Sequence, residues 1–189
     1  MTTNDSPVLE LKKGEFIKEY GEYAILHGYI VCRTGDHFIK ILREGHFIIT
    51  ETTMFGDAIQ FQAQGNARIT RLPMVSPSDF LQKQNQTQAS MIQALTCQLN
   101  IYALPVKQRI MALLYQIACE IGICQLNNCY IPTVMTQVEL AKYAHCTREY
   151  LNGVRKELIE SGWLATGRAW TLKDWRRWKE YMNHPTPPS

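Results

Sequence analysis

The segment MTQVELAKYAHCTREYLNGVRKELIESGWL, residues 135–164, contains the signals that decide the fold. Thr136 and Glu139 have the spacing of a capping box, in which a hydroxyl and a carboxylate satisfy the first amides of a helix. Thr147 suits the N-cap of a second helix, and Gly162 suits its end. Because only a tight turn is left between the two helices, the segment predicts a helix-turn-helix.

The predicted turn begins at His145, where a helix-turn-helix commonly has glycine because the backbone takes a positive φ. Histidine is among the few other residues enriched in that left-handed region, at some cost in strain. The small Ala141 allows the two helices to approach, and Leu151 and Val154 are expected to close the seam between them. We therefore expect a positive φ at His145.

The first turn of the second helix has the chemistry to contact DNA bases. A recognition helix directs its N-terminal turn into the major groove. There Arg148 could donate two hydrogen bonds to guanine, and Glu149 could accept one from the cytosine amino group. The alternative is that both charges belong to a solvated helix surface. Further candidate contacts to phosphates or bases are Thr136, Thr147, Asn152, Arg155 and Lys156.

Two elements are predicted after the second helix. Residues 163–172, WLATGRAWTL, have the pattern of a hairpin with Gly167-Arg168 at its tip, a wing from which Arg168 could reach adjacent DNA backbone. Residues 171–183 predict a helix that begins with a Thr171–Asp174 capping box. We expect this helix to pack on the DNA-binding domain through Trp175, Trp178 and Met182. The alternative is a phosphate-contacting surface made by Arg176, Arg177 and Lys179.

The first part of the chain, residues 14–75, is predicted to be a barrel or roll of short strands. The segments YAILHGYIVC and HFIKIL are rich in β-branched and aromatic residues, and RTGD between them suits a hairpin turn. Further turns are expected at REGH and QGNA.

A long helix is predicted from Phe80 to Leu104, which has no proline or glycine, with Ser76 or Ser78 as its cap. A stripe at alternating spacings of three and four predicts helix pairing; it consists of Leu81, Asn85, Gln88, Ile92, Leu95, Leu99 and Tyr102. We expect dimerisation through Ile92, Leu95, Leu99 and Tyr102. The alternative is that these four side chains pack on the β half of their own chain.

A second helix is predicted after Pro105, with an apolar face of Ile110, Leu113, Leu114 and Ile117 and an end at Gly122. Residues 123–132 are expected to be a loop with room for one short strand. The predicted class is therefore α+β. Its parts are a β-roll sensor-like domain at 1–76, a dimerisation helix at 77–104, and a winged helix-turn-helix with a C-terminal extension at 105–189.

Composition limits the class of protein. The chain has 189 residues, 46% of them hydrophobic, which is enough for one large or two small cores. A net charge of +3 is too small to indicate nucleic acid unless basic residues gather locally. The N-terminal residues lack the apolar core of a secretory signal, and no run approaches the roughly 20 apolar residues of a membrane span. We expect a cytoplasmic protein that has no membrane contact.

The sulfur and imidazole groups give no clear site. The six cysteines contain no C-x-x-C pair, so we expect buried thiols. A redox or metal switch at Cys119, Cys124 and Cys129 is the alternative. His27, His37 and His46 could converge on a metal, but solvated side chains are the simpler expectation. Since no nucleophile signature or phosphate loop is found, neither an enzyme nor a cofactor is predicted.

The helix-turn-helix segment resembles the corresponding part of the Crp/Fnr transcription regulators, through T-x-x-E-L-A at 136–141 and C-T-R-E at 146–149. Residues 12–36, KKGEFIKEYGEYAILHGYIVCRTGD, are similar to the family's opening glycine pattern. The order of parts is also that of the family over most of the chain. The resemblance implies a homodimeric regulator that binds double-stranded DNA, with RNA polymerase as a further candidate partner.

The chain departs from the family pattern at three places. The second arginine that the family often has in the recognition helix is replaced by Gly153. The family's nucleotide cassette, G-E followed by R-[ST]-A, falls on Ile49-Thr50 and Gln60-Phe61 without gaps, or on Phe55-Gly56-Asp57 and Asn66 when shifted. Neither alignment supplies the arginine that neutralises a cyclic phosphate. The cysteine cluster that binds iron–sulfur in some relatives is missing as well.

We therefore predict a sequence-specific, homodimeric transcription regulator whose β-roll does not bind cyclic nucleotide and whose effector is unknown. The rival interpretation is a sensor or protein-interaction module in which DNA binding is vestigial. Salt-dependent, sequence-specific DNA binding would distinguish the two.

Overall fold

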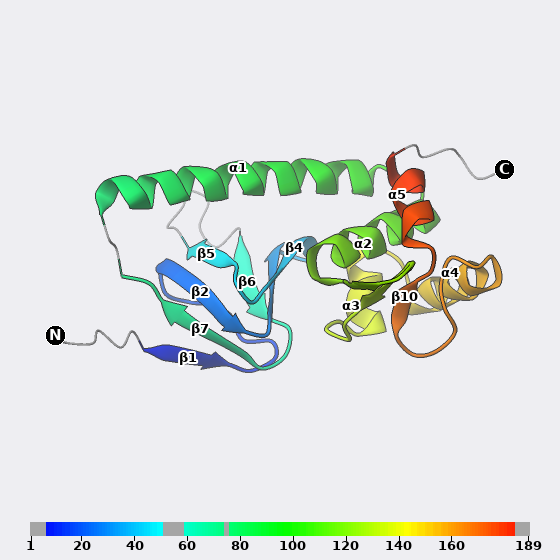
Figure 1. Cartoon of the computed structure of the whole chain (residues 1–189), viewed down its shortest axis with the longest axis horizontal. Helices are drawn as coiled ribbons and strands as arrows, with labels where there is room; N and C mark the ends of the chain where they lie inside the picture. The colour runs from blue at the N-terminus through cyan, green and yellow to red at the C-terminus, as the bar shows by residue number, and fades with distance from the viewer. Residues whose placement is uncertain (1–6, 51–58, 74–75, 184–189) are drawn as a thin grey trace. The chain divides into compact units, whose positions relative to one another are not determined.

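The structure is a computed structural model that describes residues 7–50, 59–73 and 76–183. It divides into two compact units, residues 1–99 and 100–189, each of which combines strands and helices (Figure 1). The predicted α+β class is confirmed.

The first unit is built on two antiparallel sheets. The strands are β1 (Val8–Leu11), β2 (Gly21–His27), β3 (Tyr29–Thr34), β4 (His37–Arg43), β5 (Phe47–Thr50), β6 (Gln60–Ala63) and β7 (Ala67–Arg71). One sheet has the order β1-β7-β2-β5 and the other the order β4-β3-β6. The predicted turns RTGD, REGH and QGNA contain the residues that connect β3 to β4, β4 to β5 and β6 to β7, as expected.

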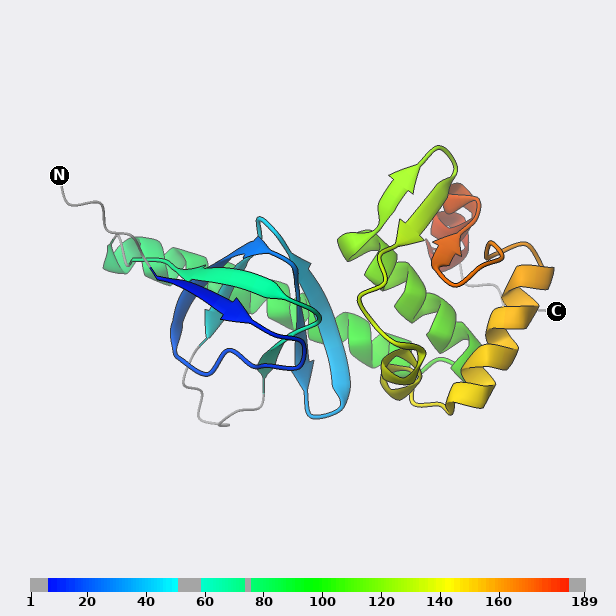
Figure 2. The ribbon, with the colours of Figure 1, turned by 90° about the horizontal axis from the view of Figure 1, so that it is seen from below.

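The two sheets enclose one hydrophobic core, which makes the unit a β-roll (Figure 2). In β2, β6 and β7 the core side chains are two residues apart, since successive residues of a strand face opposite sides. The core consists of Tyr23, Ile25, Ile48, Ala67 and Ile69 from one sheet, Ile30, Cys32, Ile39, Leu42, Phe61 and Ala63 from the other, and Met91 from the helix that follows.

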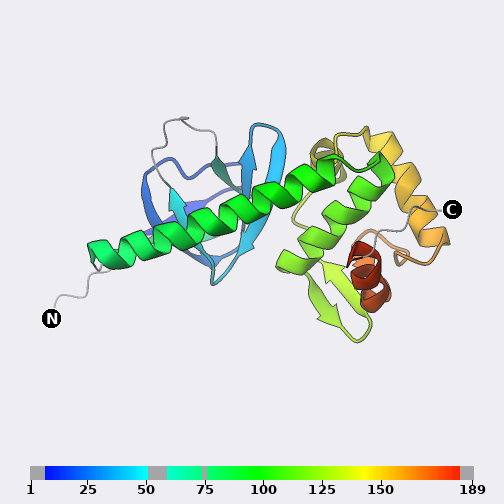
Figure 3. The same cartoon turned by 90° about the horizontal axis from the view of Figure 1, so that it is seen from above.

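Helix α1 (Pro77–Tyr102) begins at the predicted cap, where the Ser76 hydroxyl accepts a hydrogen bond from the Asp79 amide at 3.1 Å. The helix crosses the β-roll (Figure 3), and Met91 is part of the core that Leu95 also contacts. Gln98 is buried and donates to the Ile39 carbonyl at 3.1 Å. One side of α1 is thus fixed on the β-roll of its own chain.

The other side of α1 exposes apolar side chains. Leu81, Ile92 and Leu99 keep 56%, 65% and 71% of their surface exposed. The alternative prediction, that the apolar stripe packs on the β half of its own chain, is therefore wrong for Ile92 and Leu99. It is correct for Leu95.

The second unit surrounds helix α2 (Val106–Ile121), whose predicted apolar face of Ile110, Leu113, Leu114 and Ile117 is buried. The other elements are β8 (Ile123–Gln125), β9 (Asn128–Ile131), α3 (Gln137–Tyr143), α4 (Arg148–Glu160), β10 (Trp170–Leu172) and α5 (Trp175–Asn183). The strands form an antiparallel sheet in the order β10-β9-β8.

Two segments of this sheet differ from prediction. Residues 123–131 form a hairpin and not a loop, because β9 pairs with β8 and also with the distant β10. The predicted wing hairpin is shorter than expected. The first arm of this hairpin pairs with β10 only through an isolated bridge between Leu164 and Leu172. All three residues of β10 pair with β9 instead.

Helix α5 packs on the second unit, as predicted. Trp178 is fully buried and donates from Nε1 to the Trp163 carbonyl at 3.1 Å. The predicted Thr171 cap is wrong, because Thr171 lies in β10 opposite Tyr130. Asp174 acts at this end of the helix instead, since its carboxylate accepts from the Arg177 amide at 3.2 Å.

Within the described ranges, none of the helices combines the length and the apolar character that crossing a lipid bilayer requires.

Candidate nucleic-acid interface

Helix α3 begins with the capping box that the sequence predicted. The Thr136 hydroxyl accepts from the Glu139 amide at 3.2 Å, and the Glu139 carboxylate accepts from the Thr136 amide at 2.6 Å. Two amides that have no partner inside the helix are thereby satisfied. The start of α3 is thus fixed by local chemistry alone.

The turn between α3 and α4 is a Schellman motif. The amide of His145 donates to the Lys142 carbonyl at 3.1 Å, and that of Cys146 donates to the Ala141 carbonyl at 3.0 Å. His145 has a φ of 50°, which confirms the predicted left-handed backbone. Its ring makes an edge-on contact with Tyr102, with 5.0 Å between the ring centroids. The strain of a non-glycine residue is therefore accompanied by an aromatic contact.

A half-buried arginine at this turn was missed by the sequence analysis. The Arg109 guanidinium donates to the carbonyl oxygens of Tyr102, Leu104 and Ala144 at 3.1, 3.1 and 3.3 Å. It thus ties the start of α2 to the C-terminal end of α3. No sequence signal marks this role, because the three acceptors are backbone atoms.

Helix α4 has one buried face and one exposed face. Leu151, Val154 and Leu158 are buried as predicted, and the Thr147 hydroxyl accepts from the Tyr150 amide at 3.1 Å. The N-terminal turn is exposed at Thr147, Arg148, Glu149 and Tyr150. Tyr150, which was missed as a candidate contact, keeps 48% of its surface exposed. The first turn of α4 therefore exposes a cation, an anion and a phenol at consecutive positions.

The remaining candidates on α4 differ in exposure. Lys156 is exposed and Asn152 is half-buried. Gly153 faces open space, because a Cβ added there would meet nothing within 4 Å. The helix therefore has room for the arginine that the family often has at this position.

The Arg155 guanidinium is directed to the wing and not to solvent. It donates to the carbonyl oxygens of Gly167, Arg168 and Ala169 at 2.6, 2.9 and 3.1 Å. It also lies 4.5 Å from the centre of the Trp170 ring, and burial lowers its pKa. The predicted contact of Arg155 with DNA therefore has a competitor in the backbone of its own wing.

The wing places Arg168 at its exposed tip, next to Gly167 with a φ of 124°. Ala165 donates to the Thr171 carbonyl at 3.0 Å, and Lys173 donates to the Trp163 carbonyl at 2.9 Å. These bonds and the three from Arg155 hold a short wing beside α4. The structure thus brings α4 and Arg168 together within the second unit.

A pocket of about 350 Å³, called here the β-roll cavity, lies between the β-roll and α1. Its lining includes Ile49, Thr50, Gln60 and Phe61, the positions on which the nucleotide cassette falls without gaps. Among the described residues, no arginine lines it. The shifted alignment, Phe55-Gly56-Asp57, lies outside the described residues.

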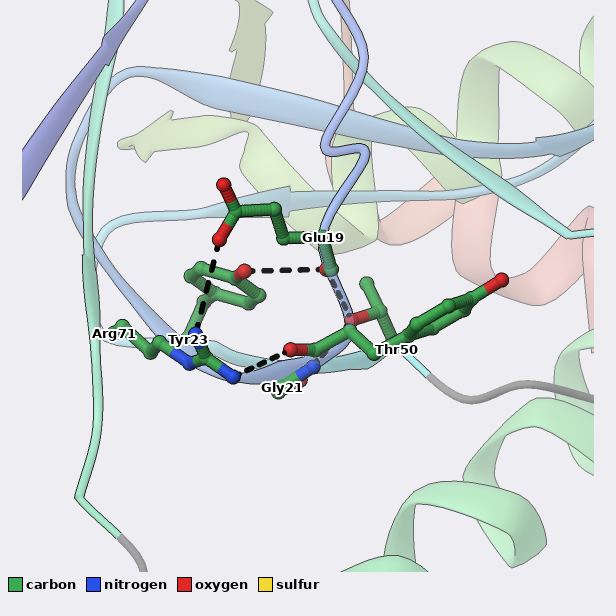
Figure 4. A network of polar contacts seen from close by, with 6 residues as sticks. Glu19, Gly21, Tyr23, Thr50 and Arg71 are labelled. Carbon is green, nitrogen blue, oxygen red and sulfur yellow. Dashed lines mark hydrogen bonds and ion pairs between the residues drawn. The ribbon is translucent and has the colours of Figure 1, made fainter.

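Next to this pocket, Arg71 belongs to a polar network with Glu19, Gly21 and Thr50 (Figure 4). Its guanidinium donates to the Tyr20 carbonyl at 2.9 Å and lies 3.7 Å from the Glu19 carboxylate. The Thr50 hydroxyl donates to the Glu19 carbonyl at 2.8 Å and accepts from the Gly21 amide. Arg71 is thus engaged by the loop before β2.

The cysteines and histidines singled out in the sequence are not gathered into a metal site among the described residues. Cys32 and Cys129 are buried as predicted, whereas the buried-thiol prediction is wrong for Cys97, Cys119 and Cys124, which are exposed. In the ranges described, no three His, Cys, Asp or Glu side chains are grouped so as to hold a metal ion.

Comparison with known proteins finds the same fold in several solved structures. No protein-family model and no curated protein sequence matches the chain. Solved structures do match over nearly its whole length. A Crp/Fnr-family transcriptional regulator of Thermus thermophilus has 20% identity and a TM-score of 0.74, over 95% of this chain and 100% of its own.

Two further structures have the same architecture. FixK2 of Bradyrhizobium japonicum has 13% identity and a TM-score of 0.73, over 93% of this chain and 96% of its own. A cyclic nucleotide-binding domain containing protein of Listeria monocytogenes has 16% identity and a TM-score of 0.71, over 90% of each chain. Both the β-roll and the helix-turn-helix unit are thus covered by the same solved structures.

Proposed function

We propose that this chain, which has the fold of the Crp/Fnr transcriptional regulators, is a member of that family and binds specific DNA sites as a homodimer. The observation that carries the proposal is the exposed first turn of α4, with Arg148 and Glu149 placed by a capped helix and a Schellman turn. The protein would act in the cytoplasm as a regulator and not as an enzyme, with RNA polymerase as a further partner.

The DNA contacts in this proposal fall into two groups. Arg148 and Glu149 contact base edges in the major groove, as a recognition helix does with its N-terminal residues. The other group positions the protein on phosphates or adds base contacts; it comprises Thr136, Thr147, Asn152, Lys156 and Arg168. Arg155 is given a positioning role, because its guanidinium already serves three wing carbonyls.

Domain roles follow the predicted division. Residues 1–76 form a sensor-like β-roll, 77–104 the dimerisation helix and 105–189 the winged helix-turn-helix. The exposed side of α1 supports dimerisation through Ile92 and Leu99, whereas Leu95 already contacts the core of its own β-roll. Tyr102 contacts His145 in the helix-turn-helix unit. In this proposal Leu95 and Tyr102 are therefore engaged within their own units and contribute less area to the dimer.

The general test is selection of bound sites from random DNA by the full-length protein. A regulator enriches one roughly palindromic sequence, and its affinity for that sequence falls with salt. The rival, an interaction module with vestigial DNA binding, enriches no sequence. The same selection at two salt concentrations therefore separates the two functions.

Arg155→Ala is expected to loosen the wing. Three carbonyls lose a charged donor. We take the low end of the range for a hydrogen bond to a charged group, about 1.5 kcal/mol, because Arg155 is only half-buried. Amides of residues 165–172 should then exchange with solvent about tenfold faster, since 1.4 kcal/mol is a factor of ten. Hydrogen exchange followed by mass spectrometry measures this. Arg168→Ala is the control, because that exposed side chain should leave exchange unchanged; equal exchange in Arg155→Ala would contradict the role.

Cyclic AMP and cyclic GMP are expected not to bind at physiological concentrations. The described lining of the β-roll cavity offers no arginine to neutralise the cyclic phosphate, and Arg71 is held by Glu19 and the Tyr20 carbonyl. Titration calorimetry with each nucleotide should show no heat above dilution. A dissociation constant in the low micromolar range for either would refute this prediction and make a nucleotide the signal.

A further inference from the structure

Two cysteines face each other on the β8–β9 hairpin. Cys124 and Cys129 are directly paired in the antiparallel register, and their Sγ atoms lie 2.7 Å apart. Directly opposed residues of an antiparallel pair have Cβ atoms roughly 4.5–5.5 Å apart, so both side chains start from neighbouring backbone positions. The strands thus hold two thiols in contact, although the sequence spacing of five gave no sign of a pair.

The backbone around Cys129 is adapted to its thiol. A Cβ added at Gly122 would lie 2.5 Å from the Cys129 Sγ and 2.3 Å from the Ala118 carbonyl oxygen. Any larger residue at Gly122 would therefore displace the sulfur or the end of α2. The glycine that ends α2 is also what allows the Cys129 thiol to lie against the helix.

The two thiols differ in access to solvent. Cys129 is fully buried, whereas Cys124 belongs to the edge strand β8 and is exposed. Burial, with a smaller contribution from Cys124, raises the pKa of Cys129 to about 12. At neutral pH Cys129 is therefore a protonated thiol shielded from solvent, and Cys124 is the sulfur that a reagent from solution can reach. This asymmetry is typical of a reacting thiol and a resolving thiol.

We propose that Cys124 and Cys129 are a redox-active dithiol that a hydroperoxide oxidises to a cross-strand disulfide. The Cys124 thiol gives up its proton, and the resulting thiolate attacks one peroxide oxygen. The O–O bond breaks, the leaving hydroxide or alkoxide takes up a proton to become water or an alcohol, and Cys124 becomes a sulfenic acid. The Cys129 sulfur then attacks the Cys124 sulfur and displaces its hydroxyl as water. The two thiols lose two electrons and two protons in total, and the peroxide is reduced.

Such a bond would be a reversible modification and not a structural brace. It encloses only residues 125–128, and the stabilisation that a disulfide gives by restricting the unfolded chain is smallest for short loops. The hairpin is in addition already held, because the Trp175 amide donates to the Asn127 carbonyl at 2.6 Å and β9 pairs with β10. Because Cys124 is exposed, reductants can reach the bond.

The third nearby cysteine, Cys119 on α2, is the competing partner. It is close enough to interact electrostatically with both thiols of the pair, and burial of its sulfur raises its pKa. Of the three, however, only Cys124 and Cys129 are held opposite each other by strand pairing. The proposal therefore assigns the disulfide to those two residues and gives Cys119 no part in it.

The test uses the full-length, fully reduced protein treated with increasing hydrogen peroxide. Free thiols are then alkylated, disulfides are reduced, and the released thiols are alkylated with a second reagent before peptide mass spectrometry. We expect the second label on Cys124 and Cys129 together, and its loss when dithiothreitol precedes the first alkylation. Cys119→Ser and Cys97→Ser should leave the result unchanged, and Cys124→Ser should abolish it.

Two results would overturn the proposal. One is a disulfide that joins Cys119 to either member of the pair, and the other is oxidation of Cys124 to sulfinic acid while Cys129 stays free. Because wild-type protein decides both, a poorly folded variant does not affect the conclusion. The readout does not depend on DNA, so this proposal and the proposed function fail independently.

Discussion

The double substitution Ile92→Asp with Leu99→Asp is expected to convert the protein from a dimer into a folded monomer. Both side chains are largely exposed in the single chain, so their replacement should not disturb the β-roll core, to which Leu95 and Met91 contribute instead. In the dimer each isoleucine or leucine contributes roughly 1.5–3 kcal/mol when fully buried. Four such side chains per dimer are lost, and carboxylates of like charge are brought together in their place.

The expected change in the dimer dissociation constant is therefore at least about a thousandfold, since each 1.4 kcal/mol is a factor of ten. Sedimentation velocity over a range of concentrations measures it, with circular dichroism to show that the fold is kept. Gln93→Asp with Asn100→Asp is the matched control, because both residues are exposed on α1 and each lies one position from the stripe. If the first double variant stays dimeric and folded, the dimer seam lies elsewhere.

Arg148→Ala is expected to weaken binding to the specific DNA site by about 1–3 kcal/mol, while binding to random DNA changes much less. The reason is the exposed position of Arg148 in the first turn of α4, where its guanidinium can donate two hydrogen bonds to one guanine. Preference at one guanine in each half-site should be relaxed. Glu149→Ala should relax preference at a cytosine or its neighbour.

Lys156→Ala is the matched control, because this exposed cation on the same helix would contact phosphate. It should weaken specific and random DNA alike and reduce the salt slope by about one. Fluorescence anisotropy with the selected site, with single-base variants and with random DNA measures all three variants. Equal losses on specific and random DNA for Arg148→Ala would show that Arg148 is a general surface charge, and would favour the vestigial-domain alternative.

Local chemistry made much of the second unit predictable. The Thr136–Glu139 capping box and the Thr147 cap involve residues only three apart, so the sequence contains all the partners. The positive φ of His145 follows from the same closeness of the two helices. Spacing likewise predicted the buried face of α4, because a helix repeats every 3.6 residues. These features needed no knowledge of distant parts of the chain.

Partners that are far apart in the sequence were not predictable. Arg155 had the composition of a DNA contact, but three carbonyls that only the wing fold places beside it accept its hydrogen bonds. Arg109 likewise donates to backbone oxygens, which carry no sequence signature. Residues 123–131 were expected to be a loop with room for one short strand. They form a hairpin instead, and its second strand, β9, also pairs with β10, about 40 residues further along the chain.

The sequence by itself thus determined most of the helices and strands, the caps of α1, α3 and α4, and the exposed charges at the start of α4. Only the tertiary structure decided which stripe residues of α1 face the β-roll, because Leu95 and Ile92 are both apolar and differ only in what lies beside them. It also decided that Cys124 and Cys129 are partners. Residues five apart do not lie on the same face of a helix, so the spacing did not indicate a pair. A two-residue turn between paired strands, however, places these two sulfurs opposite each other.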